Sequence, residues 1–181
     1  MQFLLKLSRW IDRLSEAMGW LTLGLTLVMV LVGSYNAIAR YLGRFLQVNL
    51  SSNLYIEAQW YLFSLIFLLG ASYVLEQNAH VRVDILYNRL SPKGKVWVNL
   101  IGSIFLLLPL CFVILGYSLP SVINSWQIWE QSSDPSGLPR YPIKSVIIVA
   151  FVFLALQGCS EIIKNIAILL GTETQESEVS Q

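Results

Sequence analysis

The side chains best suited to take part in chemistry lie together at one short junction. His80, Arg82 and Asp84 alternate with valines, soon after a stretch that carries no charge between Glu57 and Glu76. An extended backbone would place all three polar side chains on one side of the chain. Two interpretations stay open. Asp84 could form a local ion pair or a helix cap, or the cluster could dock this edge of the protein onto another polypeptide.

Catalytic, redox and metal chemistry would each need partners that the sequence lacks. His80 is the single histidine, so neither a haem with two histidine ligands nor a histidine-based zinc cluster is supported. Cys111 and Cys159 fall inside apolar runs and no CxxC pair occurs, so we expect buried cysteines and no thiol relay. We expect no catalytic residue, no cofactor and no metal. The net charge of +1 gives no reason to expect a nucleic acid.

The composition around these residues is that of an integral membrane protein. Hydrophobic residues make up 55% of the 181 residues, charged residues make up 13%, and the mean hydropathy is +0.61. Soluble domains carry roughly 25% charged residues, so this chain has too little charge for a solvated shell. The length indicates one domain, which we place at residues 1–171. An acidic, disordered tail is expected over residues 172–181.

Charge-free runs predict an all-α integral membrane fold with four transmembrane helices. The expected spans are residues 17–39, 55–75, 96–117 and 143–165. Ala37-Ile38-Ala39 has the form of a signal cleavage site, but the apolar region is longer than a signal core, so we expect it to be retained. Residues 1–16 are expected to form an amphipathic interfacial helix. Its apolar side comprises Phe3, Leu7, Trp10, Ile11 and Leu14, and its basic side Lys6, Arg9 and Arg13.

Serine and proline predict the boundaries of the third helix. Ser91 followed by Pro92 is a typical helix start, with the serine as N-cap. Pro109 is expected to kink the helix, and Pro120 to mark its end. Before this start, residues 84–90 are expected to form a short surface helix.

Basic residues predict the orientation in the membrane. Four spans place both termini on one side, and eight Lys and Arg residues fall on that side against four on the other. By the positive-inside rule, both termini are expected in the cytoplasm. The eight are Lys6, Arg9, Arg13, Arg82, Arg89, Lys93, Lys95 and Lys164, and the four are Arg40, Arg44, Arg140 and Lys144.

Each span also carries a one-sided set of small and polar residues. On the second span Glu57, Trp60 and Ser64 share a face, with Gly70 one to two turns further on. In lipid, small residues allow close helix approach and polar residues hydrogen-bond across helices. These sets therefore indicate either packing within the chain or contact with a larger membrane partner. The other sets are Gly33, Asn36, Ala37 and Arg40; Asn99 and Ser103; and Gln157, Glu161 and Lys164.

These residues give the chain a resemblance to a known family. A glutamate opens the second span, the runs 60–63 and 67–71 follow, and His80-Val81-Arg82-Val83-Asp84 comes after the span. This pattern resembles the small membrane subunit of tripartite ATP-independent periplasmic (TRAP) transporters, the DctQ-like family. The segment from Glu130 to Pro139 is similar to the branch labelled mannitol/chloroaromatic. The resemblance covers nearly the whole chain.

The resemblance implies a role in a three-part uptake system of a bacterial inner membrane. A periplasmic substrate-binding protein would capture an organic acid or similar solute, and a large DctM-like permease subunit would carry it inward with sodium. The present chain is then similar to an accessory scaffold of the large subunit, surrounded by membrane lipids, and is not an enzyme. The expected subunit interface comprises Glu57, Trp60, Gly70, His80, Arg82 and Asp84.

Two other classes of function are alternatives. One is a self-sufficient small channel or carrier built as a homo-oligomer, and the other is a membrane enzyme or redox protein. A path for ions or protons needs ionisable groups near a helix centre, whereas Glu57, Glu76, Glu161 and Lys164 all lie near span ends. The single histidine and the scattered cysteines disfavour the second alternative.

Overall fold

The computed structural model describes residues 2–48, 52–79, 87 and 90–171, and these residues form helices and connecting turns without a strand. The polypeptide begins with α1 (Gln2–Leu46) and α2 (Asn53–Glu76). A long third rod follows, made of α4 (Pro92–Gly102), the π-helical turn η1 (Ser103–Leu107) and α5 (Leu108–Gln127). The last helix is α6 (Arg140–Leu169).

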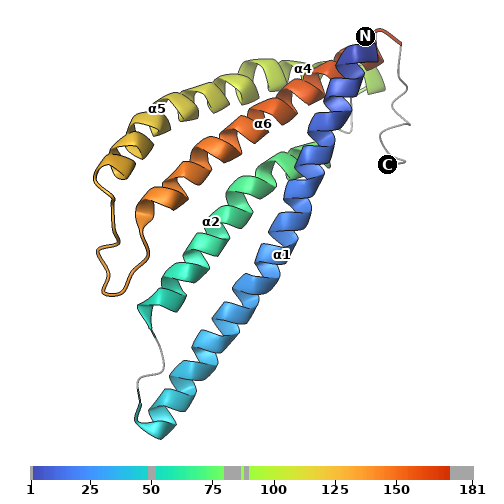
Figure 1. The fold of residues 1–181 in the computed structure, drawn as a ribbon. Coiled ribbons are helices and arrows are strands. Elements are labelled where there is room, and N and C mark those ends of the chain that lie inside the picture. The colour runs from blue at the N-terminus through green and yellow to red at the C-terminus, as the bar shows by residue number, and fades with distance from the viewer. Residues whose placement is uncertain (1, 49–51, 80–86, 88–89, 172–181) are drawn as a thin grey trace.

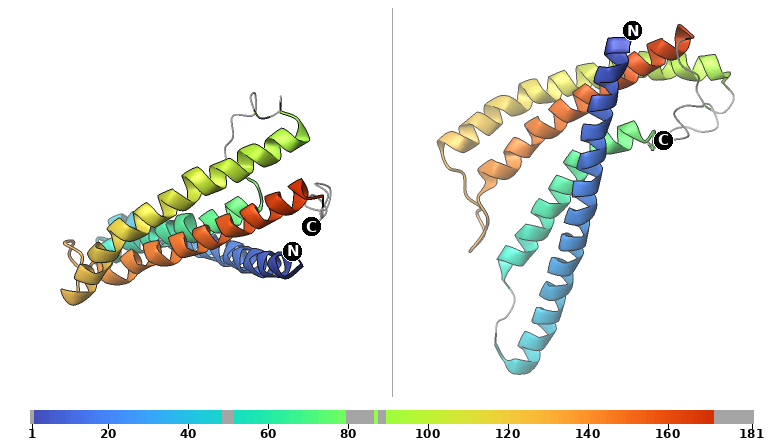
Figure 2. Two further views of the ribbon diagram at one scale, coloured as in Figure 1. Left: turned by 90° about the horizontal axis from the view of Figure 1, so that it is seen from above. Right: turned by 45° about the vertical axis from the view of Figure 1, so that its right-hand side comes forward.

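The helices form an open fan with α6 as the shared element. α1 and α2 make one antiparallel hairpin, and α5 and α6 make a second (Figure 1). The first turns of α1 lie beside the last turns of α6 in Figure 1 and Figure 2, and the far end of α1 extends away from the α5–α6 hairpin in Figure 1. Since α6 packs against α1, α2, α4 and α5, it joins the two halves of the molecule.

Among the described residues, four helical stretches are long and apolar enough to cross a membrane, and each expected span lies within one of them. The largest difference concerns α1, whose 45 residues measure about 68 Å at 1.5 Å per residue. The amphipathic segment over residues 1–16 is helical where described, and it runs into the first span without a break. The reason is local, because residues 14–18 contain neither glycine nor proline to end a helix.

Serine caps begin two of the helices. Ser91 Oγ accepts a hydrogen bond from the backbone N–H of Gly94 at 3.2 Å, and Pro92 occupies the first turn of α4. The predicted start of the third helix is therefore confirmed. Ser52 Oγ likewise accepts from the backbone N–H of Leu54 at 3.2 Å at the start of α2.

The two prolines of the third rod differ in their effects. Pro109 lies two residues after the last residue of the π-helical turn η1, which accommodates the missing N–H donor and the bulk of the proline ring. The expectation that Pro120 ends the helix is wrong, since α5 continues through it to Gln127. In an apolar environment, ending the helix would leave more backbone groups without partners than the single hydrogen bond lost at the proline.

Gly19 lies at a close contact between α1 and α2. A Cβ added there would lie 2.6 Å from the ring of Tyr73, whereas a Cβ at Gly24, on the same helix, would meet nothing within 4 Å. Contacts of 2.6 Å are repulsive, so the two helices can pack in this way only with glycine at position 19.

Gly19→Ala is therefore expected to lower the free energy of unfolding by about 1–3 kcal/mol, the usual cost of overpacking. The matched control, Gly24→Ala, should be neutral or slightly stabilising because alanine is the better helix former. Denaturation of both purified variants in one detergent, followed by circular dichroism, measures the difference. Equal stabilities of the two variants would contradict the close approach.

Candidate functional site

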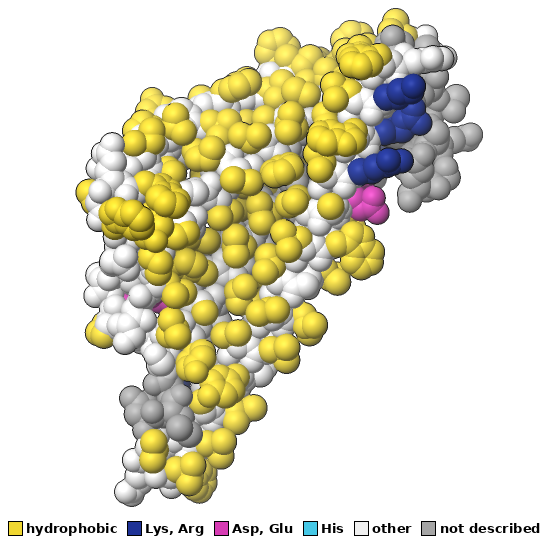
Figure 3. Space-filling model, in the orientation of Figure 1, with side chains coloured by type: hydrophobic (Ala, Val, Ile, Leu, Met, Phe, Trp, Pro, Cys, Tyr) yellow, Lys and Arg dark blue, Asp and Glu magenta, His cyan; other side chains and the backbone are white. Residues whose placement is uncertain are grey.

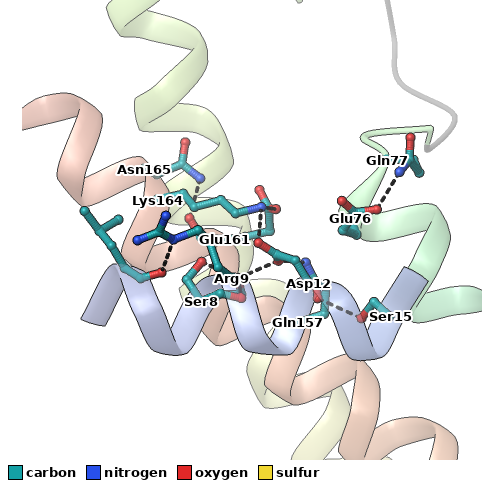
Figure 4. Close-up of polar contacts among 12 residues, drawn as sticks. Ser8, Arg9, Asp12, Ser15, Glu76, Gln77, Gln157, Glu161, Lys164 and Asn165 are labelled. Atoms are coloured by element: carbon teal, nitrogen blue, oxygen red, sulfur yellow. Dashed lines mark hydrogen bonds and ion pairs between the residues drawn. The ribbon is translucent and has the colours of Figure 1, made fainter. Parts of the chain in front are cut away.

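A buried polar cluster joins the beginning of α1 to the end of α6. It comprises Ser8, Asp12 and Ser15 of α1 with Gln157, Ser160 and Lys164 of α6, and we call it the polar seam (Figure 4). Ser15 Oγ donates to Gln157 Oε1 at 2.8 Å, and the Gln157 amide donates to Asp12 Oδ1 at 2.9 Å. The carboxylate of Asp12 therefore contacts α6, one helical turn from Ser8 and from Ser15.

The remaining contacts of the polar seam complete its hydrogen bonding. Ser160 Oγ donates to Asp12 Oδ1 at 2.8 Å and lies 2.7 Å from Ser8 Oγ. Lys164 Nζ lies 3.1 Å from Asp12 Oδ2, and both side chains are 16% exposed. Gln157 and Ser160 are fully buried. Among the described residues no buried side-chain polar atom lacks a partner, so the seam is a satisfied network and a strong constraint on helix position.

The sequence predicts only half of the polar seam. Helical spacing groups Gln157, Glu161 and Lys164 on one face of the last helix, but the pattern of residues 1–16 indicates only apolar and basic sides. The signal for the missing half is the spacing of Ser8, Asp12 and Ser15, four and three residues apart, which puts them on one helical face.

A second polar cluster joins α2 to the loop between α5 and α6. The carboxylate of Glu57 accepts hydrogen bonds from the hydroxyl of Ser132 and the backbone N–H of Leu138. One turn further along α2, the hydroxyl of Tyr61 donates to the carbonyl of Pro139. We call these five residues the loop brace, and Glu57 at its centre is only 6% exposed.

Gly137 allows the loop to fit against the brace. A Cβ at this position would lie 2.8 Å from Glu57 Oε1 and would also collide with the side chain of Ser132. Any larger residue would therefore push the loop away from α2. The loop brace and the polar seam lie at opposite ends of α6, so they connect the α1–α2 hairpin to α6 at two separated points.

An ion pair stabilises the loop from its other side. The ammonium of Lys144 on α6 pairs with the carboxylate of Glu130, and Ser125 Oγ donates to Glu130 Oε2 at 2.6 Å. These two hydrogen bonds, that of Lys144 first, hold the pKa of Glu130 below its ordinary value. Beside the pair, the rings of Trp126 and Tyr141 meet edge to face at 4.6 Å between centroids.

The lowered pKa of Glu130 predicts an acid-sensitive loop. A carboxylate whose pKa is depressed by folding stabilises the folded state above its unfolded pKa, and this contribution is lost as the pH falls through the folded pKa. The fluorescence of the adjacent Trp126 should therefore change as the pH falls below about 4.5. Glu130→Gln should remove this transition. A wild-type transition that Glu130→Gln leaves intact would assign it to another group.

The expected interface residues lie in different surroundings. Glu57 points into the chain as the centre of the loop brace, and Gly70 faces Thr22 of α1, whose Cγ2 lies 3.8 Å from the position of an added Cβ. Trp60 is 55% exposed and lines a groove between α1 and α2, together with Gly33. His80, Arg82 and Asp84 lie outside the described residues, as do most of the expected helix over residues 84–90 and the acidic tail over residues 172–181.

The cysteines differ in their exposure. Cys111 is buried, as expected, but the expectation of a buried side chain is wrong for Cys159, which lies on an exposed face of α6. An apolar helix in a membrane has both inward and outward faces, so an apolar run alone does not decide burial. Within the described residues no three His, Cys, Asp or Glu side chains lie close enough to hold a metal ion.

Comparison with protein families agrees with this architecture. Residues 29–167, well over half of the chain, match the family model described as tripartite ATP-independent periplasmic transporters, DctQ component. Comparisons with curated proteins and with solved structures found no match. With four helices able to cross a bilayer, the molecule is a multi-pass membrane protein of a transporter-component family, which is not a class of enzymes. The chain belongs to the DctQ family and is the small subunit of a TRAP transporter.

Proposed function

We propose that this small subunit is a stationary frame that supports the large, DctM-like permease subunit during uptake. The observation that carries the proposal is the attachment of α6 at both ends. The polar seam holds one end against α1, and the loop brace holds the connection at the other end against α2. A carrier whose transport part moves through the membrane needs such a frame to move against.

The positions of the charged residues favour the role of a frame over that of an independent carrier. Glu57 accepts hydrogen bonds within the loop brace, and Asp12 and Lys164 pair within the polar seam, all towards helix ends. Transport paths through membranes need ionisable groups that solute or protons can reach near the helix centres. Glu57, Asp12 and Lys164 instead take part in contacts between helices and loops.

The partners and the setting are part of the same proposal. The chain works with a DctM-like subunit and a periplasmic substrate-binding protein in a bacterial inner membrane, with both termini in the cytoplasm. The system takes up an organic acid or similar solute with sodium. The subunit interface includes the exposed face around Trp60 and the cluster of His80, Arg82 and Asp84. Glu57 and Gly70 contribute by fixing the helices behind that face.

Reconstitution tests the proposed function. Proteoliposomes that contain this chain, its large subunit and the binding protein should accumulate one of a panel of radiolabelled organic acids under an inward sodium gradient. Omitting this chain should abolish uptake, and vesicles with this chain alone should show none. Uptake by this chain alone would instead support a self-sufficient homo-oligomeric channel or carrier.

A further inference from the structure

The first turns of α1 have an inner face that is already occupied. Ser8 and Ser15 are each 1% exposed and hydrogen-bond to α6 in the polar seam, and Ile11, on the same helical face, is 5% exposed. This part of the helix is therefore fixed to the body of the protein. Its other sides stay turned outward.

Two outward faces of the same segment differ in chemistry. Phe3 is 76% exposed and Trp10 is 59% exposed on the apolar side. Lys6, Arg9 and Arg13 are exposed on the neighbouring side, at spacings of three and four residues that align them along the helix. Figure 3 shows basic side chains gathered beside hydrophobic ones at this end of the molecule.

The length of α1 determines where these two faces lie relative to the bilayer. The charge-free part from Ala17 to Ala39 is enough to cross a hydrocarbon core of about 30 Å. The preceding residues 2–16 add about 20 Å beyond it. In water, Phe3 and Trp10 would stay uncovered. The headgroup layer beyond the core is roughly 5–8 Å deep. Arg13 and Arg9 lie about 6 and 12 Å along the helix from Ala17, so their long side chains can extend to the phosphates.

We propose that Lys6, Arg9 and Arg13 of α1 bind the headgroups of anionic phospholipids in the leaflet on the side of the termini. A lipid surface fits better than an acidic protein segment, because the basic face adjoins an exposed apolar face and both continue into the lipid-facing surface of the span. Each Lys or Arg near an anionic membrane surface strengthens binding by roughly 5-fold. Glu16, which is exposed one turn after Arg13, limits the basic face towards the span.

The chain provides its own matched control for this proposal. Arg9 and Arg13 lie four residues apart near one end of α1, and Arg40 and Arg44 lie four residues apart near the other, with all four exposed. The full chain is purified in a mild detergent and titrated with phosphatidylglycerol or phosphatidylcholine of identical acyl chains. Native mass spectrometry counts the bound lipids, and circular dichroism checks that each variant keeps its helical content.

Three aligned basic residues at this factor give the wild-type chain a preference for phosphatidylglycerol of about 100-fold, which weakens at high salt. Arg9→Gln with Arg13→Gln should reduce the preference about 25-fold, and Arg40→Gln with Arg44→Gln should reduce it less, because no third basic residue aligns with that pair. The proposal is overturned if the wild type shows no preference, if the first pair of substitutions leaves it intact, or if both pairs remove it equally. Loss of the large subunit on the first substitution, with the lipid preference unchanged, would assign the face to a protein partner and also overturn it.

Discussion

Lys164→Met is expected to cause the largest loss of stability among single substitutions outside the close helix contacts. It leaves the carboxylate of Asp12, only 16% exposed, without the ammonium that lies 3.1 Å away. Removing one partner of a buried ion pair costs about 3–5 kcal/mol because the remaining charge stays buried and uncompensated. We expect about 3 kcal/mol here, since the Gln157 amide and the Ser160 hydroxyl still donate to Asp12.

Two further variants separate the charge effect from lost packing. The double substitution Asp12→Asn with Lys164→Met removes both charges of this pair and should recover part of the stability. Recovery is incomplete because Glu161, whose side chain is 8% exposed, also loses its ion pair with Lys164 at 3.4 Å. Lys93→Met, at an exposed lysine of α4, should change the free energy of unfolding by no more than about 0.5 kcal/mol. Chemical denaturation in a single detergent measures all three. A double variant as unstable as Lys164→Met would show that the ion pair is not what holds the polar seam.

Glu57→Ala is expected to release the loop between α5 and α6 from α2. The substitution leaves the backbone N–H of Leu138 and the hydroxyl of Ser132 without their acceptor. A hydrogen bond to a charged group contributes about 1.5–3 kcal/mol, so the amide of Leu138 should exchange its hydrogen about 30-fold faster. If the small subunit works as a frame, the yield of its complex with the large subunit should fall as well.

The control for Glu57→Ala is the same substitution at a glutamate in other surroundings. Glu16→Ala removes an exposed glutamate of α1 and should leave both the exchange at Leu138 and the yield of complex unchanged. Glu57→Gln keeps an acceptor oxygen for one of the two donors and places an NH₂ group against the other, so its effect should lie between those of Glu57→Ala and the wild type. Unchanged exchange at Leu138 in Glu57→Ala would refute the loop brace.

Local signals in the sequence predicted most of the fold. Charge-free runs identified the four spanning helices, and the pair Ser91-Pro92 identified the start of α4 to the residue. These features depend only on neighbouring residues, because hydrophobic length and capping are local properties. Pro120 was misjudged, since its effect depends on the cost of unpaired backbone in lipid, which exceeds the usual penalty of a proline inside a helix.

The contacts of the candidate site were less predictable. Asp12 meets Gln157 across most of the length of the chain, and Glu57 meets Leu138 across more than 80 residues. Helical periodicity places such residues on faces, but it does not say which faces meet. The sequence singled out Glu57 and Lys164 as polar residues at span ends, and only the three-dimensional arrangement shows which side chains and backbone groups they contact.

We propose that this chain works as part of a larger membrane assembly, and purification of the tagged chain from its native membrane in a mild detergent is the sharpest test. We expect a stable complex with a much larger multi-span subunit, in a fixed ratio measured by native mass spectrometry. A tagged chain that purifies only as a monomer or as a symmetric homo-oligomer, from membranes in which the large subunit is present, would contradict it.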